Sequence, residues 1–143
     1  MKQIKWLLIL MVMACSAEGW AQQCTVSAVA VSFGGYDITA GSPLNGTGSI
    51  DVTCKPATVT VVKLDPGKHS GGDYSQRKMY GKGDYLIYNL YTDAACTKIW
   101  GDGTNNTFTQ PGASNLTVYG RIPALQKVKP GDYNDFVTIV VEW

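Results

Sequence analysis

Apolar and polar residues alternate in short runs along most of the chain, and clusters of turn-forming residues separate these runs. A period of two places successive side chains on opposite faces, which is typical of β-strands with one buried face. We expect strands at residues 24–33, 48–54, 57–64, 86–91, 116–122 and 136–143, and a shorter one near 77–80. In the first run, Val29, Val31 and Phe33 are expected to share one face.

The segments between the runs carry turn chemistry, for example Pro66-Gly67 and Pro130-Gly131. No run has the period of an amphipathic helix of normal length, although Thr92 or Asp93 could cap a single helical turn. Six or seven short strands in one domain of about 120 residues predict an all-β antiparallel sandwich. The polar, glycine-containing stretch 101–113 is expected to be a surface loop.

The N-terminus has the features of a secretory signal peptide. Lys2 and Lys5 precede the apolar run 6–14, and Gly19-Trp20-Ala21 offers a small-x-small cleavage site. The apolar run is too short to span a bilayer, and we expect no transmembrane segment. We therefore expect a signal peptide at 1–21 and an exported mature domain at 22–143.

A competing motif lies inside this leader. Val12-Met13-Ala14-Cys15 resembles the box of bacterial lipoproteins, which would leave Cys15 lipidated. Met13 fits that box poorly, and Ala21 is a good alternative cleavage point. We therefore favour the ordinary signal peptide.

Three cysteines remain after the predicted cleavage, namely Cys24, Cys54 and Cys96. Export favours a disulfide, and each of the three possible pairings leaves one thiol over. Cys24 and Cys54 each stand at the end of an alternating run, which favours their pairing. Cys96 is then either a small buried apolar residue or the site of an intermolecular bridge.

Charge and residue types argue against most kinds of chemistry. The mature domain keeps ten basic and ten acidic residues, so its net charge is near zero and we expect no nucleic-acid partner. His69, the one histidine, lies in a glycine-rich stretch and is expected to be exposed and without a catalytic role. Scattered cysteines do not provide a zinc site. We expect no enzyme, no cofactor and no metal.

Aromatic residues offer an alternative function. Tyrosines such as Tyr80 and Tyr85 either line a sugar-binding face or fill the core and cross-strand pairs. Trp100 and Asp102, at the start of the 101–113 stretch, are candidates for surface binding. An adhesin or glycan-binding module is thus one alternative, and a self-sufficient secreted coat protein is another.

The last run raises a question about how the sheet is completed. Val137, Ile139, Val141 and Trp143 share the face that we expect to be core. An immunoglobulin-type sandwich closes with a further strand beside this one, and an uncovered apolar edge is an aggregation hazard. We expect either a strand from another molecule or the N-terminal strand of the same chain to cover it.

Several stretches, in this order and spacing, resemble the spore coat protein U family, which shares its domain with subunits of archaic chaperone–usher pili. They are Cys24-Thr25-Val26-Ser27, Phe33-Gly34-Gly35-Tyr36-Asp37, Gly48-Ser49-Ile50-Asp51-Val52-Thr53-Cys54, Tyr88-Asn89-Leu90-Tyr91-Thr92-Asp93-Ala94-Ala95, Trp100-Gly101-Asp102-Gly103, Tyr119-Gly120-Arg121-Ile122-Pro123 and Pro130-Gly131-Asp132-Tyr133.

The resemblance implies an incomplete immunoglobulin-like sandwich that lacks its final strand, with Cys24 bonded to Cys54 and Cys96 as a departure. It implies export through the periplasm and assembly at a bacterial surface by donor-strand complementation. The implied partners are a periplasmic chaperone, an outer-membrane usher and sister subunits. The strand-acceptor groove and chaperone contact are then formed by Val137, Ile139, Val141 and Trp143, with Trp143 as a possible anchor.

One further departure concerns the N-terminus of the mature domain. Fibre-forming relatives carry an alternating apolar extension before the first cysteine, whereas here only Gln22 and Gln23 would precede Cys24. Two residues are too few to fill a groove that takes a strand of about five. We therefore expect an acceptor-only subunit, at the tip of a fibre or as a minor component.

Overall fold

The computed structural model describes residues 3–4, 7–12 and 22–143, and its regular structure is almost entirely β-strand. The one helical element of this described part is a 3-10 turn, η1 (Tyr74–Gln76), whose first N–H groups are capped by Asp73. None of the described helical segments has the length and apolarity that a membrane span requires. Cys15 and the predicted cleavage site at 19–21 lie outside the described residues.

The larger sheet has five antiparallel strands in the order β3-β5-β10-β8-β7. Its members are β3 (Gln23–Ser32), β5 (Leu44–Lys55), β10 (Leu116–Ile122), β8 (Asp84–Tyr91) and β7 (Arg77–Gly81). Central strands such as β10 are paired on both sides, whereas β3 and β7 form the two edges.

The second sheet has the order β2-β11-β6-β9, with β2 (Leu7–Val12), β11 (Phe136–Glu142), β6 (Val61–Leu64) and β9 (Gln110–Pro111). Its pairs are antiparallel except for β2 and β11, which run parallel. A two-residue pair joins β1 (Gln3–Ile4) to β4 (Gly34–Gly35).

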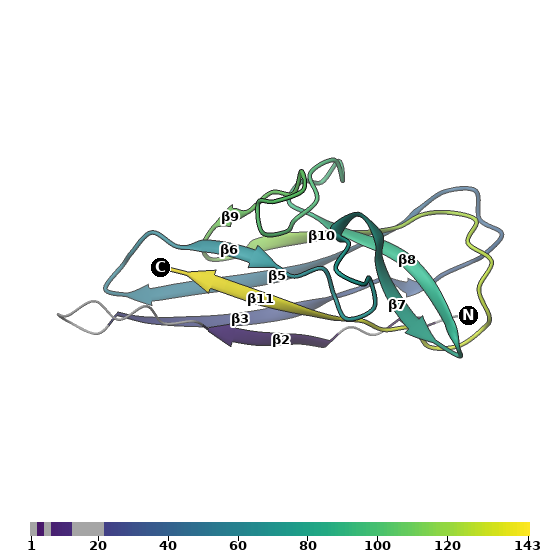
Figure 1. Cartoon of the computed structure of the whole chain (residues 1–143), viewed down its shortest axis with the longest axis horizontal. Helices are drawn as coiled ribbons and strands as arrows, with labels where there is room; N and C mark the ends of the chain where they lie inside the picture. The colour runs from purple at the N-terminus through teal and green to yellow at the C-terminus, as the bar shows by residue number, and fades with distance from the viewer. Residues whose placement is uncertain (1–2, 5–6, 13–21) are drawn as a thin grey trace.

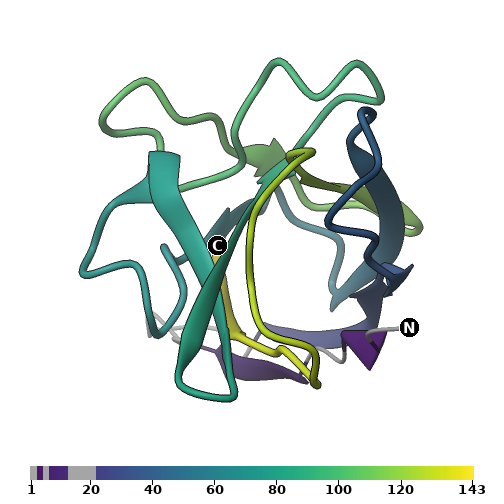
Figure 2. The ribbon, with the colours of Figure 1, turned by 90° about the vertical axis from the view of Figure 1, so that its right-hand side faces the viewer.

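The strands run along the length of the molecule and curl around a single core, as the end-on view shows (Figures 1 and 2). Inward-facing side chains of both sheets fill this core. They are Val31, Phe33, Tyr36, Ile50, Val52, Val62, Leu64, Met79, Leu86, Tyr88, Leu90, Trp100, Val118, Ile122, Val128, Tyr133, Val137, Ile139 and Val141. The predicted immunoglobulin-like antiparallel sandwich is confirmed.

Two strand predictions are wrong in detail. Val29 does not share a face with Val31, because β3 contains a register shift against β5 between Val29 and Ser32. An extra residue in one strand reverses the alternation, and Val29 is 65% exposed as a result. The run 57–64 forms a strand only over β6, from residue 61 onward.

The cysteine prediction is confirmed for the pair and open for the third residue. Cys24 and Cys54 are bonded, and they lie directly opposite each other on β3 and β5. Cys96 has a free thiol, partly exposed, in a turn where its φ is +56°. Partial burial raises the pKa of this thiol. The residues after Thr92 form turns rather than a helical turn, with Asp93 accepting from Thr97 N and Lys98 N.

Candidate functional site

The candidate site is the strand β11, on which the structure places three of the four residues predicted to form a strand-acceptor groove. Val137, Ile139 and Val141 face the core and are fully buried. The alternate residues of β11 face outward and are half-buried or exposed. Trp143 follows the strand, partly buried, and packs against the core.

The inner edge of β11 is paired from Thr138 to Glu142. Residues 139–142 pair antiparallel with β6. Asp65, just after β6, extends this pairing because its N–H donates to Thr138 O at 3.0 Å and its carboxylate accepts from Thr138 N at 2.9 Å. Main-chain groups alternate in direction along a strand. The N–H and C=O groups of Val137, Ile139 and Val141 therefore point to the opposite, outer edge.

The outer edge of β11 is occupied by β2, a strand from the region predicted to be the signal peptide. The two strands pair in parallel over six residues, from Phe136 opposite Leu7 to Val141 opposite Val12. β2 also contacts β3, the edge strand of the larger sheet. β2 therefore contacts both sheets on this side, through its pairing with β11 and its contact with β3.

A buried carboxylate stands immediately before β11. Asp135 is fully buried and accepts hydrogen bonds from the Tyr88 hydroxyl at 2.5 Å and from Lys68 N at 3.0 Å. It also lies 3.1 Å from Nδ1 of His69. Burial raises the pKa of Tyr88 far above its ordinary value, with Asp135 as the next cause, so this hydroxyl remains a donor. The start of β11 is therefore tied both to β8 and to the segment after β6.

A second buried charge, Arg77, organises the polar groups on the other side of this region. Its guanidinium donates to the main-chain oxygens of Asp65 and Trp100 and to the side chain of Asn89, each at 2.7 Å. Asn89 in turn donates to Tyr74 O. Burial lowers the pKa of Arg77. Arg77 therefore has a structural role, linking β7 to the segments that follow β6 and precede the 101–113 loop.

The structure does not support Trp100 as a surface-binding residue. Trp100 is fully buried, and its indole N–H donates to Val62 O at 3.0 Å across the two sheets. Asp102 is partly exposed, and its carboxylate accepts from Thr104 N at 2.9 Å within a tight turn. The two residues are therefore not brought together as a surface site.

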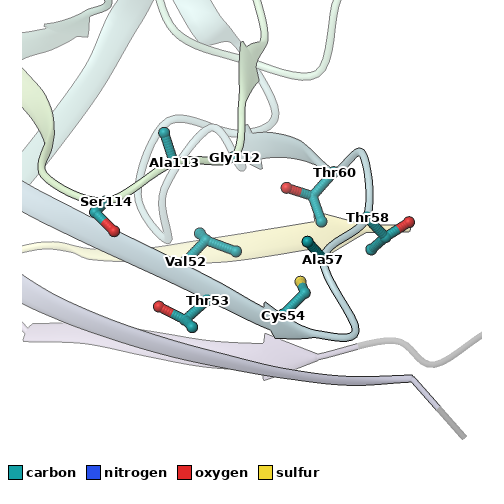
Figure 3. Close-up of a pocket in the computed structure, with 9 residues that line it drawn as sticks. All are labelled: Val52, Thr53, Cys54, Ala57, Thr58, Thr60, Gly112, Ala113 and Ser114. Carbon is teal, nitrogen blue, oxygen red and sulfur yellow. The ribbon is translucent and has the colours of Figure 1, made fainter.

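Two small cavities are lined by residues of β5 and of β11. One, of about 270 Å³, is lined by residues 52–54, 57–58, 60 and 112–114 beside the disulfide, and Figure 3 shows hydroxyls of Thr60 and Ser114 at its walls. The other, of about 340 Å³, lies on the outer face of β11 between Asp65, Lys68, Phe136 and Thr138. The first has no ionisable side chain in its lining, so it provides no acid or base for catalysis.

Sequence comparison assigns the chain to a family. The model of the Spore Coat Protein U domain matches residues 12–140. The chain belongs to the Spore Coat Protein U domain family. One relative in this comparison is Protein U of Myxococcus xanthus, which is 33% identical over 125 residues, covering 78% of this chain and 70% of that protein.

A solved structure shares the fold of this family member. It is a chain in the crystal structure of the CsuC–CsuE chaperone–tip adhesion subunit pre-assembly complex from archaic chaperone–usher Csu pili of Acinetobacter baumannii. The TM-score is 0.55 at 20% sequence identity, and the match covers 85% of this chain. The present chain spans 40% of the length of that chain, so the likeness concerns the fold.

Sequence reasoning missed the polar residues that hold β11 in place. Asp135 and Arg77 each precede alternating residues, and their charge by itself gives no indication that they are buried. The sequence predicts an exposed His69 without a catalytic role, whereas its ring is partly buried beside Asp135. The available signal was the parity of residues 77–81, which places Arg77 on the same face as Met79.

Proposed function

We propose that this chain is an exported structural subunit of a bacterial surface pilus or coat, and that its β11 edge receives a strand from another polypeptide. The observation that carries the proposal is the parallel pairing of β11 with β2. β2 lies within residues 1–21, which we propose to be a signal peptide removed on export. Without β2, the outer edge of β11 would expose unpaired main-chain groups above an apolar core, which is an aggregation hazard.

The proposed partners are a periplasmic chaperone as the first strand donor, sister subunits as later donors, and an outer-membrane usher as the assembly site. Membership of the Spore Coat Protein U domain family supports this role, as does the shared fold with a chain of a chaperone–subunit complex. Strand addition gives affinity through main-chain hydrogen bonds and specificity through pockets for alternate side chains. Those pockets would lie beside Val137, Ile139 and Val141, with Trp143 as an anchor at the end of the strand.

We further propose that the subunit accepts a strand but does not donate one. Cleavage after Ala21 leaves Gln22 and Gln23 before the first cysteine, and Gln23 already belongs to β3. Strands that complete a sheet have about five residues. The subunit would therefore occupy an end of a fibre, as a tip or minor component.

The first experiment separates this role from that of a self-sufficient coat protein. Residues 22–143 are expressed in the periplasm alone and together with a periplasmic chaperone of the archaic chaperone–usher type. We expect aggregation or degradation of the chain alone and a stoichiometric complex with the chaperone. A stable monomer in the absence of the chaperone would contradict the proposal.

A photocrosslinking experiment locates the contact. A photoreactive amino acid replaces Val140, which is half-buried on the outer face of β11, or Tyr119, which is half-buried on β10 between two paired strands. We expect crosslinks to the chaperone from position 140 and none from position 119. Equal crosslinking from both positions would mean that the contact is not made along the β11 edge.

Acceptor-only behaviour has its own test. A synthetic peptide with the sequence of residues 22–33 is offered to a chaperone-bound sister subunit, in parallel with that subunit's natural donor peptide. We expect the natural donor to displace the chaperone and the peptide from this chain to leave the complex intact. Displacement by this peptide would show that the chain can donate a strand.

A further inference from the structure

Two tyrosines on the β7–β8 hairpin form an aromatic surface together with a histidine. Tyr80 and Tyr85 are 43% and 50% exposed, and their ring centroids lie 5.2 Å apart. The ring of His69 lies 5.6 Å from Tyr80 and 6.3 Å from Tyr85. We call these three residues the ring patch.

The two tyrosines do not contribute to the hydrophobic core. On β7, Arg77, Met79 and Gly81 face inward, whereas Tyr80 faces solvent. Tyr85 lies directly opposite Tyr80 in the hairpin register. Tyr80 exchanges both of its main-chain hydrogen bonds with Asn134 instead of Tyr85. The tyrosines therefore form a non-hydrogen-bonded pair, in which side chains approach most closely.

The ring of His69 is held in place by Asp135. Nδ1 of His69 lies 3.1 Å from Oδ1 of the fully buried Asp135, which leaves Nε2 on the far side of the ring. Gly67, at φ +82°, precedes this loop, and a Cβ there would come within 2.2 Å of the Asp135 carboxylate. The loop can therefore approach Asp135 closely only with glycine at this position. A buried anchor and a paired hairpin make the patch pre-organised, which lowers the entropic cost of binding.

Two lysines lie near the ring patch. Nζ of Lys78 lies 5.9 Å from the centroid of the Tyr85 ring. The exposed Lys68 is adjacent to His69 in the chain, and its Nζ lies 5.7 Å from the centroid of the Phe136 ring on β11. Among nearby carboxylates, Asp135 is buried and both oxygens of Asp84 accept main-chain N–H groups. The main chain of Asp132 lies under Gly81, on the face of the hairpin opposite Tyr80.

We propose that the ring patch, with Lys68 and Lys78, is a binding site for an acidic polysaccharide. Rings with an apolar face and a polar edge suit sugar rings, which also have apolar C–H faces and hydroxyl edges. The ammonium group of Lys78 beside the Tyr85 ring matches a carboxylate of a uronic acid chain, and Lys68, next to His69 in the chain, adds a second positive charge. The three rings and Lys78 lie outside β11, whereas Lys68 also approaches Phe136 of β11. The inference does not depend on strand addition.

Binding is measured with the folded full chain against polygalacturonic acid and against its fully methyl-esterified form, which keeps the sugar chain but removes the charge. We expect binding to the acid that weakens as salt is raised and is at least tenfold weaker for the ester, about the effect of one charge-assisted contact. No binding to the acid, or equal binding to acid and ester, would overturn the proposal.

Variants then locate the site. The double variant Tyr80→Ser/Tyr85→Ser is expected to lose at least tenfold in affinity, as central tyrosines in binding sites do on truncation. Phe108→Ser is the matched control, because Phe108 is a 44% exposed ring with the ammonium of Lys98 5.7 Å from its centroid. Lys78→Gln should weaken binding to polygalacturonic acid and leave binding to the methyl-esterified form unchanged. Unchanged affinity in the folded double variant, or an equal loss in the Phe108 control, would overturn the proposal.

Discussion

The hydroxyl of Tyr88, on β8, donates a 2.5 Å hydrogen bond to the carboxylate of Asp135, the residue just before β11. Both side chains are fully buried, and the contact joins the five-stranded sheet to the four-stranded one. The strand proposed to receive a donor is therefore fixed at its beginning by a bond to the opposite sheet.

Tyr88→Phe should lower the free energy of unfolding by about 2 kcal/mol, because the buried carboxylate loses a donor while the ring still fills its place. Tyr85→Phe removes a hydroxyl from a half-exposed ring three residues earlier on the same strand, and should change stability by less than about 0.5 kcal/mol. Chemical denaturation of the two variants and the wild type measures both values. Equal changes in the free energy of unfolding for the two substitutions would show that the hydrogen bond between Tyr88 and Asp135 does not stabilise the fold.

Arg77→Met should destabilise the fold by about 3–5 kcal/mol, since the buried oxygens of Asp65, Trp100 and Asn89 then lose their charged donor. Thermal and denaturant-induced unfolding give the measurement. Arg121→Met is the control, because Arg121 is only half-buried and donates to Asn45 near the surface. A cost of less than about 1 kcal/mol is expected for that control. A similarly small cost at Arg77 would contradict the network described here.

The disulfide should contribute about 3–4 kcal/mol, because it closes a loop with a sequence separation of 30 residues in the unfolded chain. Replacing Cys24 and Cys54 together by serine is expected to lower stability by this amount. Cys96→Ser, which removes the partly exposed free thiol, should leave stability unchanged under non-reducing conditions. If the single and double variants lose stability equally, the bridge is not the source of the stabilisation.

Acid should weaken three surface turns. Asp37, Asp73 and Asp102 each accept hydrogen bonds from the hydroxyl and the N–H of a residue two positions later, and these bonds lower each pKa below 3.8. A lowered pKa in the folded state contributes stability above pH 3.8 that is lost as the pH falls through the folded value. The midpoint temperature of thermal unfolding should therefore decline progressively as the pH is lowered below about 4.

The turn at Asp102 allows a direct check of this explanation. Thr104→Val removes the hydroxyl that bonds the carboxylate at 2.6 Å but keeps the main-chain donor. The pKa of Asp102, followed by NMR titration of its carboxyl carbon, should rise toward 3.8 in this variant. An unchanged pKa would mean that the hydroxyl is not the main cause of the shift.

The alternation of apolar residues was sufficient to predict the sandwich and the inward set on β11. Such features are local, because the parity of a strand follows from the backbone of that strand alone. The position of Cys24 and of Cys54 at the end of an alternating run likewise favoured the observed disulfide. Prediction failed at Val29, where one register shift reverses the parity without a local signal.

The amino-acid sequence by itself determined the class of fold, the strand faces and the family to which the chain belongs. Only the tertiary structure decided that β2 covers β11, that Asp135 and Arg77 are buried, that Trp100 is internal, and that His69 meets Tyr80 and Tyr85. Each of these relationships joins segments far apart in the chain. Their geometry depends on how strands are ordered and registered across two sheets, and periodicity within one segment carries no information about that order.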